Sequence, residues 1–171
     1  GAGHFQGQTV AKLQPMKVAA FEALWETHDP APFAIAAGID QEGKKNSFEI
    51  GIPGALSFVV HDSFKGEVKG INDLQKEAEL KHGAGDYVPN VTSMFWSFRV
   101  MILAGIIMLV TSIVGYYLHV KGKLLNNRVA LKSIYHLLAL PFIANSTGWY
   151  VAEAGRQPWL VYGLQKTVDG A

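Results

Sequence analysis

The sequence predicts an all-α membrane protein: a fragment of a transmembrane helical bundle that carries an extramembrane loop domain. Residues 100–118 contain no charged side chain and form a run long enough to cross the roughly 30 Å of hydrocarbon in a bilayer. A second run, residues 133–152, is also uncharged apart from any proton on His136. Basic residues are concentrated between the two runs, at Lys121, Lys123, Arg128 and Lys132. Because basic loops stay on the cytoplasmic side, both outer ends are expected on the opposite side.

The predicted organisation has five parts. Residues 1–92 form an outer-face loop, residues 93–120 and 133–155 form transmembrane helices, residues 121–132 form a cytoplasmic connector, and residues 156–171 return to the outer face. Interface aromatics are expected at Tyr116, Tyr117, Trp149, Tyr150 and Trp159. A buried helical hairpin in a soluble protein is the alternative. Two runs near the spanning length, separated by basic residues, favour the membrane over it.

Composition excludes several classes of site. The chain has 171 residues, of which 49% are hydrophobic, and its formal net charge of +1 gives no argument for nucleic-acid binding. It has no cysteine, so disulfides, thiolate metal sites and iron–sulfur clusters are excluded. The chain starts at GAGHFQGQ without a methionine, and we expect it to be a piece of a longer protein.

The loop is expected to contain short helices and turns. Residues 16–26 are helix formers, and the segment 28–32 breaks their pattern. The stretch EIGIPGALSF, residues 49–58, predicts turns with short helices, and INDLQKEAELKHG, residues 71–83, predicts a short solvated helix.

The stretch GWYVAEAGRQPW, residues 148–159, ends the second run with an acid and a base. Trp149 and Glu153 are four apart and share a helix face, and Arg156 can pair with Glu153 if the helix continues. Pro141 is expected to interrupt this helix earlier. One interpretation is a capping ion pair at the membrane surface. The other is a carboxylate ligand or proton-relay acid whose charge is held by an arginine.

The stretch FWSFRVM, residues 95–101, opens the first run. Arg99 at a membrane boundary usually extends to the lipid headgroups, and Met101 usually fills helix packing. The alternative makes Met101 a thioether ligand to haem iron, a ligand type that raises the haem reduction potential, with Arg99 at a haem propionate. Residues two apart do not share a helix face, so Arg99 would have to reach around toward the haem edge.

In the loop, Lys17 precedes Glu22 by five residues, and Glu22 and Glu26 are four apart. An ordinary solvated amphipathic helix is the simpler interpretation. The alternative uses Lys17 to hold a polar head group and Glu22 to accept a proton. The six histidines of the chain show no metal-ligand spacing.

Three stretches together, KVAAFEALWET, FWSFRVM and GWYVAEAGRQPW, resemble the larger, haem-bearing subunit of cytochrome bd-type quinol oxidases in both order and spacing. The resemblance covers essentially the whole chain and implies a short quinol loop followed by two helices of the membrane bundle. It implies a low-spin haem b, a high-spin haem b and haem d as cofactors, and quinol as substrate at the outer face of the cell membrane. Ubiquinol and menaquinol both remain open.

The resemblance also assigns roles to individual positions. Met101 resembles the axial ligand to the iron of the low-spin haem b, and Glu153 the carboxylate at the iron of the high-spin haem b. Motif positions near the haems are occupied by Arg99, Trp149 and Arg156. The quinol-oxidation positions are occupied by Lys17 and Glu22.

The chain departs from the family in what it lacks. The family's histidine ligands to the low-spin haem and to haem d lie in earlier helices, and no histidine here matches them. The chain alone is therefore expected to be inactive. Its expected partners are the remainder of subunit I, subunit II, membrane lipid and quinol, with no nucleic acid.

Two functions are compatible with these features. The first is part of a terminal respiratory oxidase in which electrons pass from quinol through the haems b to haem d, where oxygen is reduced to water. The second is a non-enzymatic membrane helical hairpin that acts as an assembly or anchoring module.

Overall fold

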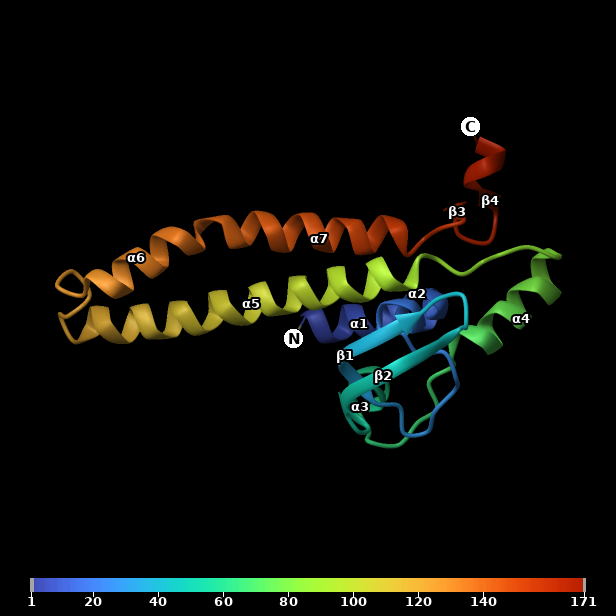
Figure 1. Cartoon of the computed structure of the whole chain (residues 1–171), viewed down its shortest axis with the longest axis horizontal. Helices are drawn as coiled ribbons and strands as arrows, with labels where there is room; N and C mark the ends of the chain where they lie inside the picture. The colour runs from blue at the N-terminus through green and yellow to red at the C-terminus, as the bar shows by residue number, and fades with distance from the viewer. Residues whose placement is uncertain (1, 171) are drawn as a thin grey trace. The chain divides into compact units, whose positions relative to one another are not determined.

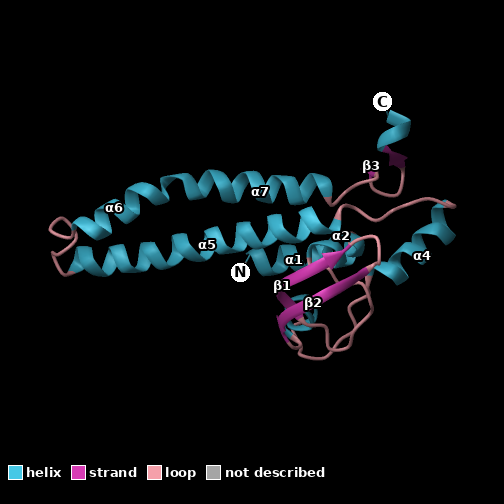
Figure 2. Ribbon diagram, viewed as in Figure 1, coloured by secondary structure: helices cyan, strands magenta, loops and turns pink. Residues whose placement is uncertain are grey.

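The computed structural model describes residues 2–170, which divide into two compact units. The loop unit comprises Gly1–Trp96 and Tyr150–Ala171, and the helical unit comprises Ser97–Trp149. Helices dominate the chain, as predicted, but the loop unit also contains strands (Figure 2).

The helical unit is built from two antiparallel arms (Figure 1). The first arm is α5 (Val91–Val120), whose 30 residues extend about 45 Å at the usual helical rise. The second arm consists of α6 (Arg128–His136), the 3-10 turn η1 (Leu137–Ala139) and α7 (Leu140–Ala154). The arms approach closely where Gly115 of α5 faces the side chain of Ile134 of α6. Within residues 2–170, α5 is the one helix long and apolar enough to cross a membrane.

The second apolar run is interrupted, as predicted from Pro141. This residue is the second of α7, which begins directly after η1. Proline lacks an N–H and its ring clashes with the preceding helical turn, so a continuous helix through this point is disfavoured. Further back, the Asn127 side chain caps α6 by accepting a hydrogen bond of 3.0 Å from the Ala130 N–H. Helix α6 therefore begins inside the basic segment between the two runs.

The loop unit has its own hydrophobic core. Helices α1 (Ala2–Leu13), α2 (Pro15–Phe21) and α4 (Ile71–His82) and the first turns of α5 belong to this unit. Its most buried large side chains include Ile71, Val91, Met94 and Phe95. Tyr150 near the end of α7 donates a hydrogen bond of 2.7 Å from its hydroxyl to Ser93 Oγ of α5. The helix predicted over residues 71–83 is confirmed as α4.

The all-α prediction is wrong for the loop unit. Strands β1 (Phe33–Asp40) and β2 (Lys45–Ile52) pair antiparallel, and α3 (Ala55–His61) follows. In β2, Phe48, Ile50 and Ile52 recur with period two, which is a strand pattern. The glycines and prolines nearby obscured it, so residues 49–52 were expected to be turn. A second small hairpin, β3 (Trp159–Val161) and β4 (Gln165–Lys166), precedes the 3-10 turn η2 (Thr167–Gly170).

The helix predicted over residues 16–26 is shorter than expected. Pro15 begins α2, a position that proline favours, and the helix ends at Phe21. Glu22 is its C-cap, and Ala23 then adopts a left-handed conformation with φ of 51°. Glu22 and Glu26 therefore do not share a helix face: the first is 2% exposed, whereas the second is exposed to solvent.

Candidate functional site

A charged cluster forms in the loop unit from Lys17, Glu153 and Arg156. Arg156 Nη2 and Glu153 Oε2 form an ion pair. The pair was expected only if the helix continued to Arg156, but α7 ends at Ala154, so the pair forms across the helix end. Lys17 Nζ donates a hydrogen bond of 2.8 Å to the carbonyl oxygen of Ala152, the residue before the acid. The structure therefore brings Lys17 close to Glu153 and Arg156, the acid and the base of the stretch GWYVAEAGRQPW.

Glycine at position 155 makes this approach possible. A Cβ atom there would lie 2.8 Å from Lys17 Cγ and 2.5 Å from Met94 Cε, closer than real Cβ contacts allow. The aliphatic part of Lys17 thus packs directly on the backbone that follows α7. Pro15, at the start of α2, fixes the helix that presents this lysine.

The charges of the cluster act on Lys17 in opposite directions. Partial burial lowers the pKa of its ammonium group below the usual value, and the positive charge of Arg156 lowers this pKa further. The negative charge of Glu153 raises the same pKa and so opposes both effects. The charged form of Lys17 is therefore less stable here than in water. A neighbouring anionic or hydrogen-bonding ligand would stabilise this charged form.

Glu153 and Arg156 are neither fully buried nor fully exposed. Their side chains are 45% and 36% exposed, respectively. The ion pair uses Oε2 of the carboxylate, and a carboxylate has further acceptor capacity on its second oxygen. The surface-cap interpretation and the ligand interpretation of Glu153 therefore both remain compatible with the geometry.

The other predicted residues lie elsewhere. Glu22 is in the core of the loop unit, whereas Arg99, Met101 and Trp149 belong to the helical unit. Trp149 is 68% exposed. Met101 is partly buried, and its sulfur faces α7 at Gly148, where a Cβ atom would lie only 2.9 Å from Sδ.

Haem is the cofactor that these residue types suit. Among the described residues no three histidine, cysteine, aspartate or glutamate side chains gather as a metal site. A haem needs fewer protein ligands than a bare metal ion, because the porphyrin holds the iron and side chains supply only axial ligands. Met101 and Glu153 offer donor atoms of suitable type, and Arg99 and Arg156 are suited to propionate carboxylates. The residue types present are therefore compatible with haem as a cofactor.

An aromatic cluster near the C-terminus was missed by the sequence reasoning. The ring of Trp159 meets His82 edge to face at 4.7 Å and stacks with Tyr87 at 5.7 Å, measured between ring centroids. Tyr162 lies beside the same indole at 6.1 Å. Trp159 was expected only as an interface aromatic, and no spacing in the sequence links it to His82, which is 77 positions earlier in the numbering. These contacts join α4 to the segment after α7.

The fold and the site define a class of protein: a helical protein with one helix, α5, long and apolar enough to cross a membrane among the described residues, and a structured loop unit in which a lysine contacts the segment of an acid–arginine pair at a helix end. The chain belongs to the family of cytochrome bd terminal oxidase subunit I, whose family model matches residues 1–171.

Several relatives support this assignment. Cytochrome bd ubiquinol oxidase subunit 1 of Bacillus subtilis (strain 168) is 45% identical over 169 residues, which cover 98% of this chain and 36% of that protein. Cytochrome bd-II ubiquinol oxidase subunit 1 of Escherichia coli (strain K12) is 27% identical, with 96% of this chain and 43% of that protein covered. A chain of the solved bd oxidase from Geobacillus thermodenitrificans superposes with a TM-score of 0.74 at 32% identity, covering 99% of this chain and 37% of its own length. This chain therefore spans well under half the length of the relatives it matches.

Proposed function

We propose that this chain is the quinol loop and two following helices of the haem-bearing subunit of a terminal oxidase. In the complete enzyme, quinol is oxidised at the outer face of the cell membrane, and its electrons pass through haems b to haem d, where oxygen is reduced to water. The activity belongs to the complete subunit together with subunit II.

One observation carries the proposal: Lys17 of the loop donates its hydrogen bond to Ala152 beside the Glu153–Arg156 pair. A quinol bound at Lys17 would therefore lie near the residues assigned to a haem, which is what electron transfer requires. A membrane anchor or assembly module has no need for such a cluster, and no observation favours that alternative.

Each residue has a proposed role. Lys17 holds a quinol oxygen, and Glu22 accepts a proton from quinol. The haem groups supply the electron-carrying chemistry when bound. Met101 provides the thioether for the low-spin haem b and Glu153 the carboxylate for the high-spin haem b. The residues proposed to stabilise bound haem are Arg99, Trp149 and Arg156.

The proposed topology follows from charge. The loop unit lies on the outer face, and the basic segment between the arms lies on the cytoplasmic side. The second arm crosses the membrane as α6, η1 and α7 together, although the 3-10 turn divides it.

Substitution in the complete enzyme tests the quinol site. Lys17→Ala and Glu22→Gln should lower quinol oxidation strongly while leaving the haem spectrum unchanged, because neither residue is assigned to iron. Lys12→Ala and Glu26→Gln are matched controls, since both are exposed in the same part of the loop unit and have no assigned role. Normal quinol oxidation in both site variants, or equal loss in the controls, would refute the assignment.

A further inference from the structure

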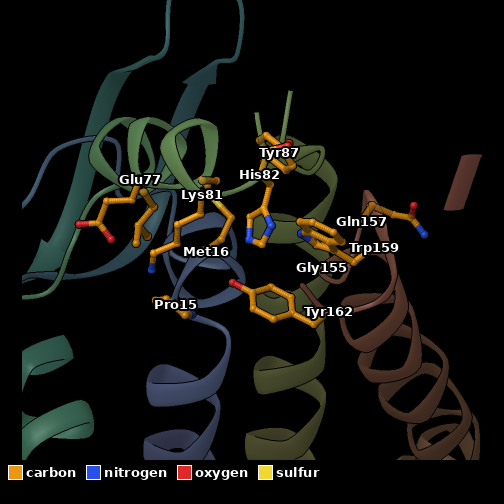
Figure 3. Close-up of a pocket in the computed structure, with 12 residues that line it drawn as sticks. Pro15, Met16, Glu77, Lys81, His82, Tyr87, Gly155, Gln157, Trp159 and Tyr162 are labelled. Atoms are coloured by element: carbon orange, nitrogen blue, oxygen red, sulfur yellow. The ribbon is translucent and has the colours of Figure 1, made fainter. Parts of the chain in front are cut away.

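A cavity of about 130 Å³ lies in the loop unit beside the charged cluster. Its wall includes Met16 of α2, His82 of α4, Tyr87, and Trp159 and Tyr162 of the segment after α7. Figure 3 shows the imidazole, the indole and the Tyr162 phenol around one space, with Met16 on the side of α2. Three separate stretches of the chain thus build a single aromatic site.

The rings around the cavity hold one another in place. Trp159 contacts both His82 and Tyr87, and Tyr87 donates hydrogen bonds from its hydroxyl to the carbonyl oxygens of His82 and Gly83 at 3.2 and 3.1 Å. Tyr87 is 2% exposed and Trp159 is 7% exposed. The walls are therefore rigid flat surfaces, against which a planar ring can stack at little cost in side-chain ordering.

The size of the cavity suits one six-membered ring. An engineered apolar cavity of about 150 Å³ in another protein binds benzene. A water molecule needs far less space, about one probe sphere, so this cavity is larger than ordinary internal hydration requires.

The cavity also offers polar contacts and a connection to Lys17. The Tyr162 hydroxyl can donate a hydrogen bond, and partial burial, which raises its pKa above the usual value, further favours this protonated form. Met16 and Gly155 both line the cavity, and Lys17 directly follows the first and packs its Cγ against the second. A ring in the cavity thus has the loop lysine as a near neighbour.

We propose that this cavity is the subsite for the quinol ring, with Trp159 and His82 as specificity-determining walls and Tyr162 as a hydrogen-bond donor to a ring oxygen. The inference rests on the proposed function, because it names where the substrate of that reaction is held. It assigns binding roles only and leaves proton acceptance to Glu22.

Steady-state oxidation of duroquinol, a tetramethyl benzoquinol, by the complete enzyme tests the subsite. Trp159→Leu and His82→Ala should each raise KM about three- to tenfold, the range expected for losing an aromatic contact, with kcat and the haem spectrum unchanged. Tyr162→Phe keeps the ring, removes the hydroxyl and should raise KM about two- to tenfold. Phe64→Leu and His61→Ala are matched controls in the same unit that do not line the cavity, and their KM should stay at the wild-type value.

The outcomes separate the two ideas. If the wild-type complex does not oxidise duroquinol, the proposed function fails. If it does, and His82→Ala and Tyr162→Phe keep the wild-type KM with intact haem, the ring subsite is overturned while the proposed function stands. Photolabelling of the wild-type enzyme with an azido-substituted benzoquinone provides a check that needs no variant. Labels are expected on residues 77–87 or 155–162, and labelling confined to other segments overturns the assignment.

Discussion

Gly148→Ala is the sharpest test of the proposed role of Met101, because it displaces the sulfur while leaving the methionine in place. A Cβ atom at position 148 would lie 2.9 Å from Met101 Sδ. Ordinary contacts between such atoms are about 3.5–4.0 Å, so the thioether must move by roughly 0.6–1 Å. If Met101 binds haem iron, a displacement of this size would weaken that bond, whereas a side chain that only fills space can adopt another rotamer.

The expected effect on stability is small because two contributions oppose each other. Replacing glycine by alanine inside a helix stabilises by about 0.5–1 kcal/mol. Forcing an extra methyl group into a packed contact costs about 1–3 kcal/mol. The net change therefore lies between about zero and 2.5 kcal/mol of destabilisation, which a folded membrane complex should tolerate.

The assay is the optical spectrum and redox titration of the low-spin haem b in the complete enzyme. Gly148→Ala should shift the spectrum and lower the potential, because a weakened thioether bond raises the potential less. Gly105→Ala is the control: it lies in α5, and no atom within 4 Å of its Cβ position comes from outside its own helix among the described residues. An unchanged haem in Gly148→Ala, or an equal shift in Gly105→Ala, would show that Met101 does not bind iron.

Four further predictions concern the complete enzyme. Met101→Leu should convert the low-spin haem b to a high-spin form or remove it, whereas a residue that only packs would tolerate this swap at under about 1.5 kcal/mol; haem spectra distinguish the two. Glu153→Gln should remove the high-spin haem b and oxygen reduction while the low-spin haem remains; a mere surface pair would cost only about 0–1 kcal/mol, with all haems retained. If quinol oxidation needs protonated Lys17, its rate should decline on the alkaline side at a pH below 10.5, the ordinary lysine pKa. Arg156→Gln removes a positive charge that lowers the pKa of Lys17, so this variant should move the decline to higher pH. An unmoved pH–rate profile argues against a protonated Lys17 in the reaction. A cysteine at Lys123 should resist an impermeant thiol reagent on intact cells, and rapid labelling would contradict the cytoplasmic assignment.

Much of the helical architecture could be predicted because it depends on local patterns. The apolar run that became α5 is recognisable from length and lack of charge alone, and Pro141 marked the interruption of the second arm. The end of α2 could not be predicted in the same way. Residues 16–26 all have acceptable helix propensity, and only the buried position of Glu22 and the left-handed turn at Ala23 end the helix. Tertiary packing decided that boundary, as it did for the β1–β2 hairpin.

In the candidate site, too, contacts between residues close in the sequence could be predicted and contacts between distant residues could not. The Glu153–Arg156 pair joins residues only three apart, so the sequence could suggest it, although α7 ends at Ala154 and the helix spacing rule does not extend to Arg156. Lys17 lies 135 positions before Ala152, and no periodicity predicts that contact. It depends on the Lys17 side chain packing against the backbone at position 155, where a side chain larger than that of glycine would clash. The aromatic cavity could not be predicted from the sequence either, because no sequence pattern links the three stretches that line it.

The hydrogen bond from Lys17 to the end of α7 is compatible with the substrate role proposed for the same residue. The last carbonyl groups of a helix have no partner within it and carry a partial negative charge. Lys17 donates to one of these carbonyl groups, that of Ala152. Glu153 in the final turn favours the ammonium charge there, but burial and the positive charge of Arg156 oppose it and together lower the pKa of Lys17. An ammonium group has three N–H donors, and this bond uses one. If Lys17 binds quinol as proposed, it would keep the loop attached to the helix end through this bond and would offer its other donors to a quinol oxygen.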